Sequence, residues 1–118
     1  MPSLPAMSDH AAPLEISVEE ARRLLTTSPA GRLLLDVREP DELAICRVPG
    51  AMAIPMRQIP AQLGALPRDR HILVLCHHGG RSLRVTQYLR ANGLATVSNI
   101  VGGIDAWAER IDPALTRY

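Results

Sequence analysis

Residues 72–83 read ILVLCHHGGRSL, a stretch that passes from four apolar residues to a cysteine, two histidines, two glycines, an arginine and a serine. The apolar half has the length of a β-strand that is buried on both faces, as strands of parallel sheets are. A second stretch of this kind, RLLLDV, occupies residues 32–37. Two such strands predict an α/β domain built around a parallel sheet.

Helical patterns separate the predicted strands along the rest of the chain. We expect further short strands at 14–16, 52–55 and 96–101, and helices within 17–27, 56–66, 82–91 and 102–110, with a short helix opened by residues 38–42. Ser17 is predicted to cap the first helix in a capping box with Glu20. The helix at 82–91 is predicted to face inward through Leu83, Val85, Tyr88 and Leu89. This alternation implies about five parallel strands with helices on both faces.

Length and composition are those of one globular domain. The chain has 118 residues, of which 47% are hydrophobic and 21% charged. We expect a domain at 14–112, a mobile N-terminal tail at 1–13 and a C-terminal tail at 113–118. The end of the chain, IDPALTRY, is expected to fray rather than to dock on a partner.

Charge and cysteine content narrow the functional classes. A formal net charge of +1 offers no one-signed field for nucleic acid or an anionic membrane, so neither partner is expected. Residues 1–13 resemble neither a signal peptide nor a membrane span, and we expect a cytoplasmic protein. Cys46 and Cys76 are interpreted as intracellular thiols, and a single disulfide between them stays open.

Cys76 is the candidate nucleophile because it stands where a buried strand ends and a helix begins, the edge at which open parallel sheets bind ligands. Gly79 and Gly80 allow the loop N–H groups to turn toward one point, as in anion-binding nests. The N-terminus of the following helix and the Arg81 guanidinium add positive charge, which favours a reactive thiolate. A buried structural cysteine beside a glycine turn is the alternative.

His77 and His78 suggest a metal site together with Cys76. Adjacent side chains in a tight loop rarely converge on one ion, and the sequence offers no further ligand cluster, so no metal is expected. We expect the two histidines to line the mouth of the pocket. The competing interpretation is that they face solvent and have no functional role.

Four motifs occur in a shared order: LLLDVREPDEL at 33–43, VPGAMAIP at 48–55, LCHHGGRS at 75–82 and NIVGGIDAW at 99–107. In this order and spacing the chain resembles a rhodanese-like single-domain sulfurtransferase over residues 14–110. The resemblance implies the rhodanese fold and a cysteine, here Cys76, that carries sulfur as a persulfide. It implies transfer from a donor such as thiosulfate to cyanide or a thiol, without metal or organic cofactor.

The resemblance also assigns the surrounding residues. It implies that the loop from His77 through Gly79, Gly80 and Arg81 to Ser82 holds the substrate. Asp36 and Arg38 resemble the family's Asp and Arg, with a structural ion pair as the alternative. A sulfur-relay protein is a further expected partner.

The loop from Cys76 to Arg81 spans six residues, C-x-x-x-x-R, whereas related phosphatases use one residue more. This length suits a single sulfur atom rather than a tetrahedral phosphate. A small phosphatase or arsenate reductase is therefore the weaker alternative, and a sulfur-delivery or protein-interaction module with little turnover is the other.

Several features lie outside these assignments. Cys46 and Arg47 stand where the family often has Gly-His, which leaves the local turn in doubt. Cys46 is interpreted as an ordinary small apolar residue, with a resolving thiol as the alternative. Trp107 is predicted to fill the core, Gly50 to permit a turn, and Gly102 and Gly103 to allow close backbone approach.

Overall fold

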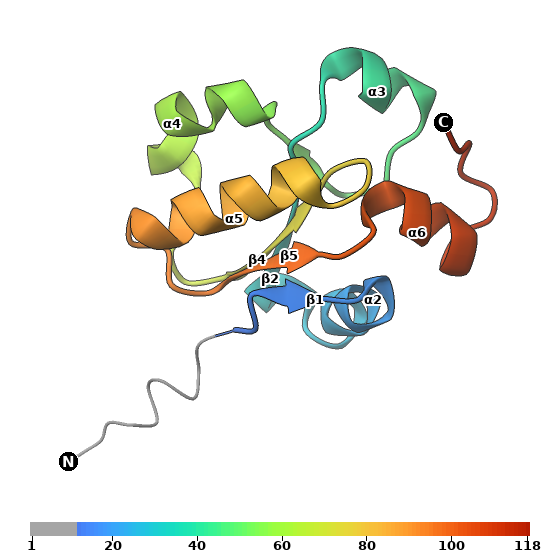
Figure 1. The fold of residues 1–118 in the computed structure, drawn as a ribbon. Coiled ribbons are helices and arrows are strands. Elements are labelled where there is room, and N and C mark those ends of the chain that lie inside the picture. The colour runs from blue at the N-terminus through green and yellow to red at the C-terminus, as the bar shows by residue number, and fades with distance from the viewer. Residues whose placement is uncertain (1–11) are drawn as a thin grey trace.

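The computed structural model describes residues 12–118 and shows a five-stranded parallel sheet with helices on both faces (Figure 1). The predicted N-terminal tail therefore lies almost wholly outside the described residues. The strands are β1 (Glu15–Ile16), β2 (Arg32–Asp36), β3 (Met52–Ala53), β4 (His71–Leu75) and β5 (Val97–Ile100), and their order across the sheet is β1-β5-β4-β2-β3. The two long apolar runs, β2 and β4, pair with each other at the centre, as their burial on both faces predicts.

The helices were placed correctly by periodicity, apart from details of their ends. The elements are α2 (Val18–Thr27), η1 (Pro29–Gly31), α3 (Pro40–Ile45), η2 (Met56–Gln58), α4 (Ile59–Gln62), η3 (Leu63–Ala65), α5 (Gly80–Ala91) and α6 (Gly103–Arg110). Ser17 caps α2 by accepting the Glu20 N–H at 3.0 Å. The Glu20 carboxylate binds Arg23 instead of completing the predicted capping box.

Side chains alternate between the two faces of the sheet and form two separate cores. One face carries Leu34, Leu73 and Leu75 against α2 and α6, and Trp107 belongs to this core as predicted. The opposite face carries Leu35, Ile72, Val74 and Cys76 against α4 and α5.

Helix α5 corrects one prediction. Its buried residues are Ser82, Val85, Thr86 and Leu89, while Leu83 is half-buried and Tyr88 is exposed. The polar members are tolerated because each hydroxyl is hydrogen-bonded, Thr86 to the Ser82 carbonyl at 2.8 Å and Ser82 within the site described below. The inward face therefore follows the spacing 82, 85, 86 and 89 and not the apolar residues alone.

Among residues 12–118, no helix has both the length and the apolar character needed to cross a membrane.

Candidate active site

Cys76 directly follows β4 at the carboxyl end of the sheet, and its side chain is buried. The Gly79 N–H points at its sulfur, with N to Sγ at 3.0 Å. Gly79 reaches this position with φ of +110°, and a Cβ there would lie 3.2 Å from the backbone nitrogen of Gly102. Glycine is therefore required at 79 both for its backbone angle and for space. Helix α5 begins at the next residue, so its N-terminal end faces the sulfur.

A buried serine and asparagine complete the surroundings of the sulfur. Ser82 Oγ lies 3.2 Å from Cys76 Sγ and 2.5 Å from Asn99 Oδ1. The Asn99 amide nitrogen donates to the Gly79 carbonyl and to Glu15, both at 3.1 Å, so its oxygen must be the acceptor that faces Ser82. One hydroxyl hydrogen cannot serve Asn99 and Cys76 together. Ser82 can accept from a Cys76 thiol while bound to Asn99, and can turn to donate to a thiolate.

The loop backbone is held from below by the start of α6. The N–H groups of Ile104 and Asp105 donate to the carbonyls of Cys76 and His77 at 2.8 and 3.1 Å. Gly103 has φ of +59°, and a Cβ there would collide with both of these carbonyl oxygens. The predicted close approach at Gly103 is thus made to the Cys76 loop itself.

Gly103→Ala should therefore destabilise the protein and displace the loop. The left-handed backbone and the clash together should cost about 2 kcal/mol or more in the free energy of unfolding. Urea unfolding measures this loss, and Gly64→Ala is the matched control because a Cβ at Gly64 meets no atom within 4 Å. Equal stabilities of the two variants would contradict the proposed clamp.

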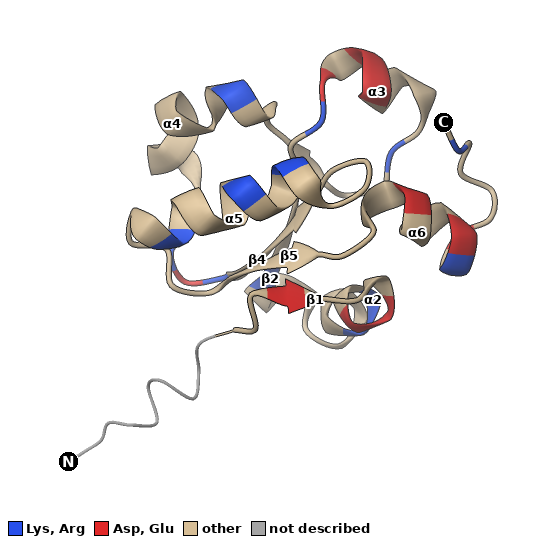
Figure 2. Ribbon diagram, in the orientation of Figure 1, with Lys and Arg blue, Asp and Glu red and all other residues tan. Residues whose placement is uncertain are grey.

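The Arg81 guanidinium forms a two-pronged ion pair with Glu42 of α3, at 2.7 and 2.8 Å. The same carboxylate accepts a hydrogen bond from the Tyr118 hydroxyl at 2.8 Å. Figure 2 shows the acidic residues of α3 and the basic start of α5 that this pair joins. The role of Arg81 toward substrate stays a prediction.

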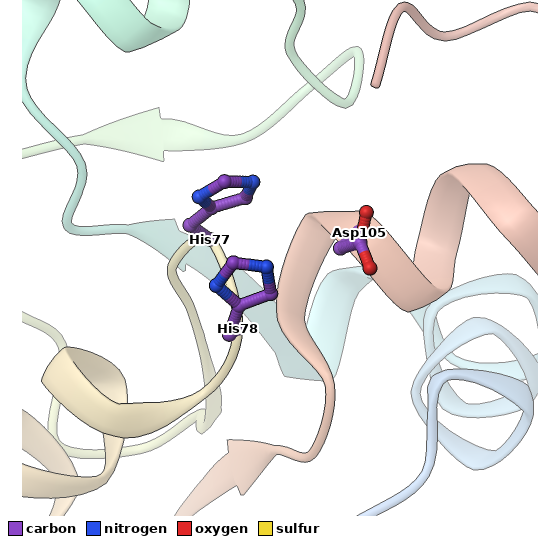
Figure 3. A group of neighbouring side chains, drawn as sticks. All are labelled: His77, His78 and Asp105. Atoms are coloured by element: carbon purple, nitrogen blue, oxygen red, sulfur yellow. The ribbon is translucent and has the colours of Figure 1, made fainter. Parts of the chain in front are cut away.

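His77 and His78 lie at the mouth of the loop with their rings stacked, and Asp105 of α6 faces them (Figure 3). Ligand atoms of the three residues lie within 4.8 Å of one another, so they form a candidate metal cluster in which Asp105, not Cys76, is the third member. His77 Nε2, however, lies 2.8 Å from the Tyr118 carbonyl oxygen, and Asp105 is paired with Arg117 at 3.0 and 3.1 Å. His77 and Asp105, two of the three candidate ligands, are thus already bound to other groups of the protein.

The family model of the Rhodanese-like domain matches residues 17–110. The chain belongs to this family. It is 41% identical over 76 residues to a sulfurtransferase of Allochromatium vinosum, covering 64% of this chain and 71% of that protein. The structure of the human single-domain sulfurtransferase TSTD1 superimposes with a TM-score of 0.75 at 28% identity, over 84% of this chain and 98% of that one. These matches support sulfur transfer as the general activity.

Some relatives of this rhodanese-like domain are much longer. The chain spans 30% of the Rhodanese-like/PpiC domain-containing protein 12, chloroplastic, of Arabidopsis thaliana, to which it is 39% identical over 89 residues and 72% of its own length. It spans 27% of the adenylyltransferase and sulfurtransferase MOCS3-1 of Zea mays, at 31% identity over 126 residues and 95% of its own length. The activities of those whole proteins are not carried over by the match.

Asp36 and Arg38 of the rhodanese-like domain form an ion pair at 2.8 Å, and both side chains are fully buried. All five guanidinium N–H groups have acceptors: Asp36, the Glu42 and Cys46 carbonyls, and the Tyr118 hydroxyl. Burial lowers the pKa of Arg38, but the hydrogen bonds to Asp36 and Tyr118 outweigh it and the net shift is upward. The pair ties the end of β2 to the middle of α3 and to its C-cap, and a substrate role for it stays a prediction.

Cys46 packs against the core on the α2 and α6 side, whereas Cys76 belongs to the core on the α5 side. Both described cysteines are free thiols. The placement agrees with Cys46 as a small apolar residue.

The rhodanese-like site includes three residues that the sequence did not single out. Asn99 is a buried amide in the four-residue strand β5, one position before its end, and a polar residue in a buried strand was the available signal. Glu42 lies in the acidic run that opens α3. A carboxylate there is equally typical of the first turn of a helix, so the sequence did not mark it as a site residue. Tyr118 gave no signal, and its packing contradicts the expectation that the end of the chain frays.

Glu42 should make stability depend on pH. The hydrogen bonds from Arg81 lower its pKa from 4.5 to about 2. A carboxylate with a lowered folded-state pKa stabilises the protein above its ordinary pKa, and this contribution disappears as pH falls from about 4.5 toward 2. Glu42→Gln should therefore lose about 2 kcal/mol at pH 7 and almost nothing near pH 2.

Urea unfolding at several pH values tests this expectation, with Glu19→Gln as the control. Glu19 forms an exposed pair with Arg110 at 3.4 Å, which should contribute little at any pH. A Glu42→Gln deficit that stays constant down to the acid limit would exclude the ion pair as its source.

Proposed function

We propose that this protein is a thiosulfate-type sulfurtransferase that carries sulfur as a persulfide on Cys76. The observation that carries the proposal is the Gly79 N–H aimed at Cys76 Sγ, 3.0 Å away, in front of the N-terminus of α5. An amide donor and a helix dipole at one atom stabilise negative charge there. Both the thiolate and the persulfide formed from it carry that charge.

The reaction proceeds in two displacements. The Cys76 thiolate attacks the outer sulfur of thiosulfate, a Cys76 S–S bond forms, and sulfite leaves with the electron pair of the broken bond. The Cys76 persulfide keeps one negative charge. An acceptor, cyanide or a thiolate, then attacks the outer sulfur, which yields thiocyanate or an acceptor persulfide and returns the Cys76 thiolate.

The loop residues His77, His78, Gly79, Gly80, Arg81 and Ser82 are proposed to surround the transferred sulfur, with Asp36 and Arg38 supporting them. Ser82 is suited to the exchange because its hydroxyl can donate either to Asn99 or to Cys76. The six-residue loop supports sulfur over phosphate, since a single atom needs the narrower cradle. We propose no metal or organic cofactor for this step.

A sulfur-delivery module that receives its sulfur from another protein is the second candidate. It is favoured by a long relative whose name joins adenylyl transfer with sulfur transfer, at 95% coverage of this chain. A free, buried thiol suits a reducing compartment, so a cytoplasmic location is part of the proposal.

Intact mass after incubation with thiosulfate tests the proposal. A gain of one sulfur atom that cyanide removes is expected. If thiosulfate adds no sulfur but a cysteine desulfurase charged with its own substrate does, the delivery module is the better description. Release of phosphate or reduction of arsenate without any sulfur gain would overturn both.

A further inference from the structure

The last residues of the sequence pack onto the catalytic loop instead of leaving the domain. The Tyr118 ring stacks on the His77 ring with centroids 3.8 Å apart and planes 7° from parallel. Its carbonyl oxygen lies 2.8 Å from His77 Nε2. His77 is thus held between Tyr118 on one face and His78 on the other.

Tyr118 also reaches the far end of the loop. Its hydroxyl donates to Glu42, the carboxylate that holds Arg81, and accepts from the buried Arg38 at 2.9 Å. The ring therefore lies beside the first residue after Cys76, and the hydroxyl is linked through Glu42 to the arginine that closes the loop. One side chain spans the mouth from end to end.

Three further contacts hold this segment in place. Leu115 packs against the core on the α2 and α6 side, and its N–H donates to the Asp112 carbonyl at 3.1 Å. Arg117 pairs with Asp105 of α6, whose backbone N–H holds the His77 carbonyl. Figure 1 shows the chain end between α3 and α6, at the end of the sheet where Cys76 lies.

We propose that residues 112–118 are a cover over the acceptor side of the Cys76 loop, and that a protein bearing an acceptor thiol must displace it. This inference rests on the proposed sulfur transfer for its purpose but not for its test. Tyr118 remains 38% exposed, and the Arg117–Asp105 pair is also partly exposed. Exposed contacts of this kind contribute little each, so opening the cover costs chiefly the hydrogen bonds of Tyr118 to Glu42 and Arg38.

The consequence is selection by size. A small nucleophile can pass a stacked ring, whereas the surface of a protein must occupy the space that Tyr118 and Arg117 fill. Tyr118 is in this sense a specificity-determining residue, because it gates approach to the sulfur and takes no part in the displacement. Its partners His77, Glu42 and Arg38 give a displacing protein polar groups to bind once the tyrosine has left.

Alkylation of the unloaded Cys76 thiol measures the cover without any turnover. Iodoacetamide is the small probe and a maleimide on a long poly(ethylene glycol) chain is the bulky one, with the modified cysteine located by peptide mass. Relative to the wild type, Tyr118→Ala should react about tenfold faster with the bulky reagent and less than about twofold faster with the small one. The difference is expected because the cover is closed most of the time in the wild type and only the bulky reagent must wait for it to open. Tyr118→Phe keeps the stacked ring and should fall between wild type and Tyr118→Ala.

The matched control is Tyr88→Ala, which removes an exposed tyrosine from α5 away from the loop mouth. Its ratio of bulky to small reagent rates should equal that of the wild type. The cover is overturned if Tyr118→Ala changes both rates equally, changes neither, or leaves Cys76 closed to the bulky reagent. Failure of thiosulfate to add sulfur would refute the proposed function and leave these rates unaffected.

Discussion

Cys76→Ser should abolish sulfur transfer and the gain of sulfur from thiosulfate. A serine hydroxyl in the same loop cannot form the persulfide, and the loss of the proposed nucleophile should lower the rate by about a thousandfold or more. The fold should survive, because serine keeps the size of the side chain and can accept the Gly79 N–H and bond to Ser82. Thiocyanate formation from thiosulfate and cyanide measures the rate.

Cys46→Ser is the matched control for this experiment. Cys46 belongs to the opposite core, so its replacement should leave the sulfur gain intact and affect stability only slightly. Sulfur retained by Cys76→Ser would identify another acceptor residue and refute the assignment. Sulfur that is gained by Cys46→Ser but never released to a thiol would instead assign Cys46 as the resolving thiol.

Arg38→Leu should be the most destabilising of the substitutions considered. It leaves the Asp36 carboxylate fully buried without a counter-charge and removes the side-chain donor from the carbonyls of Glu42 and Cys46. Breaking one side of a buried ion pair costs about 3–5 kcal/mol, a large part of the stability of a small domain. Chemical unfolding by urea, followed by circular dichroism, measures the difference.

The double variant Asp36→Leu/Arg38→Leu separates loss of the pair from loss of a charge partner. With no unpaired charge left, it should recover a large part of the lost stability. Arg23→Leu, which breaks an exposed pair with Glu20, should change stability by less than about 1 kcal/mol. If Arg38→Leu behaves like Arg23→Leu, the buried pair does not anchor α3. If a folded Arg38→Lys protein loses affinity for thiosulfate alone, Arg38 binds substrate.

The sheet and the place of the Cys76 loop at the end of β4 could be predicted because both have signals in the local sequence. The apolar runs of β2 and β4 indicate strands that are buried on both faces. Gly79 and Gly80 shortly after Cys76 indicate that the strand ends there and a loop begins. The remaining elements followed from periodicity and turn residues, and the resemblance to the rhodanese-like family named the fold. The structure confirms this fold, including the five parallel strands.

The walls of the site could not be predicted because their contacts are distant in sequence. Arg81 meets Glu42 across 39 positions, and Tyr118 meets the same carboxylate across 76. The residues next to Arg81 and Tyr118 in the sequence do not indicate that either side chain binds a distant carboxylate. Inward-facing Ser82 and Thr86 were missed for a related reason, since hydrogen bonds and not hydrophobicity make their burial acceptable.

The place of Tyr118 has a practical consequence for anyone who attaches an affinity tag or a fusion partner. Whatever follows this residue starts beside His77 and would crowd the entrance to the sulfur. Ala12 and Pro13, by contrast, are bound by Arg90 near the end of α5 and by Ser98 of β5. That attachment lies toward the opposite end of the sheet, so purification handles belong in front of the domain.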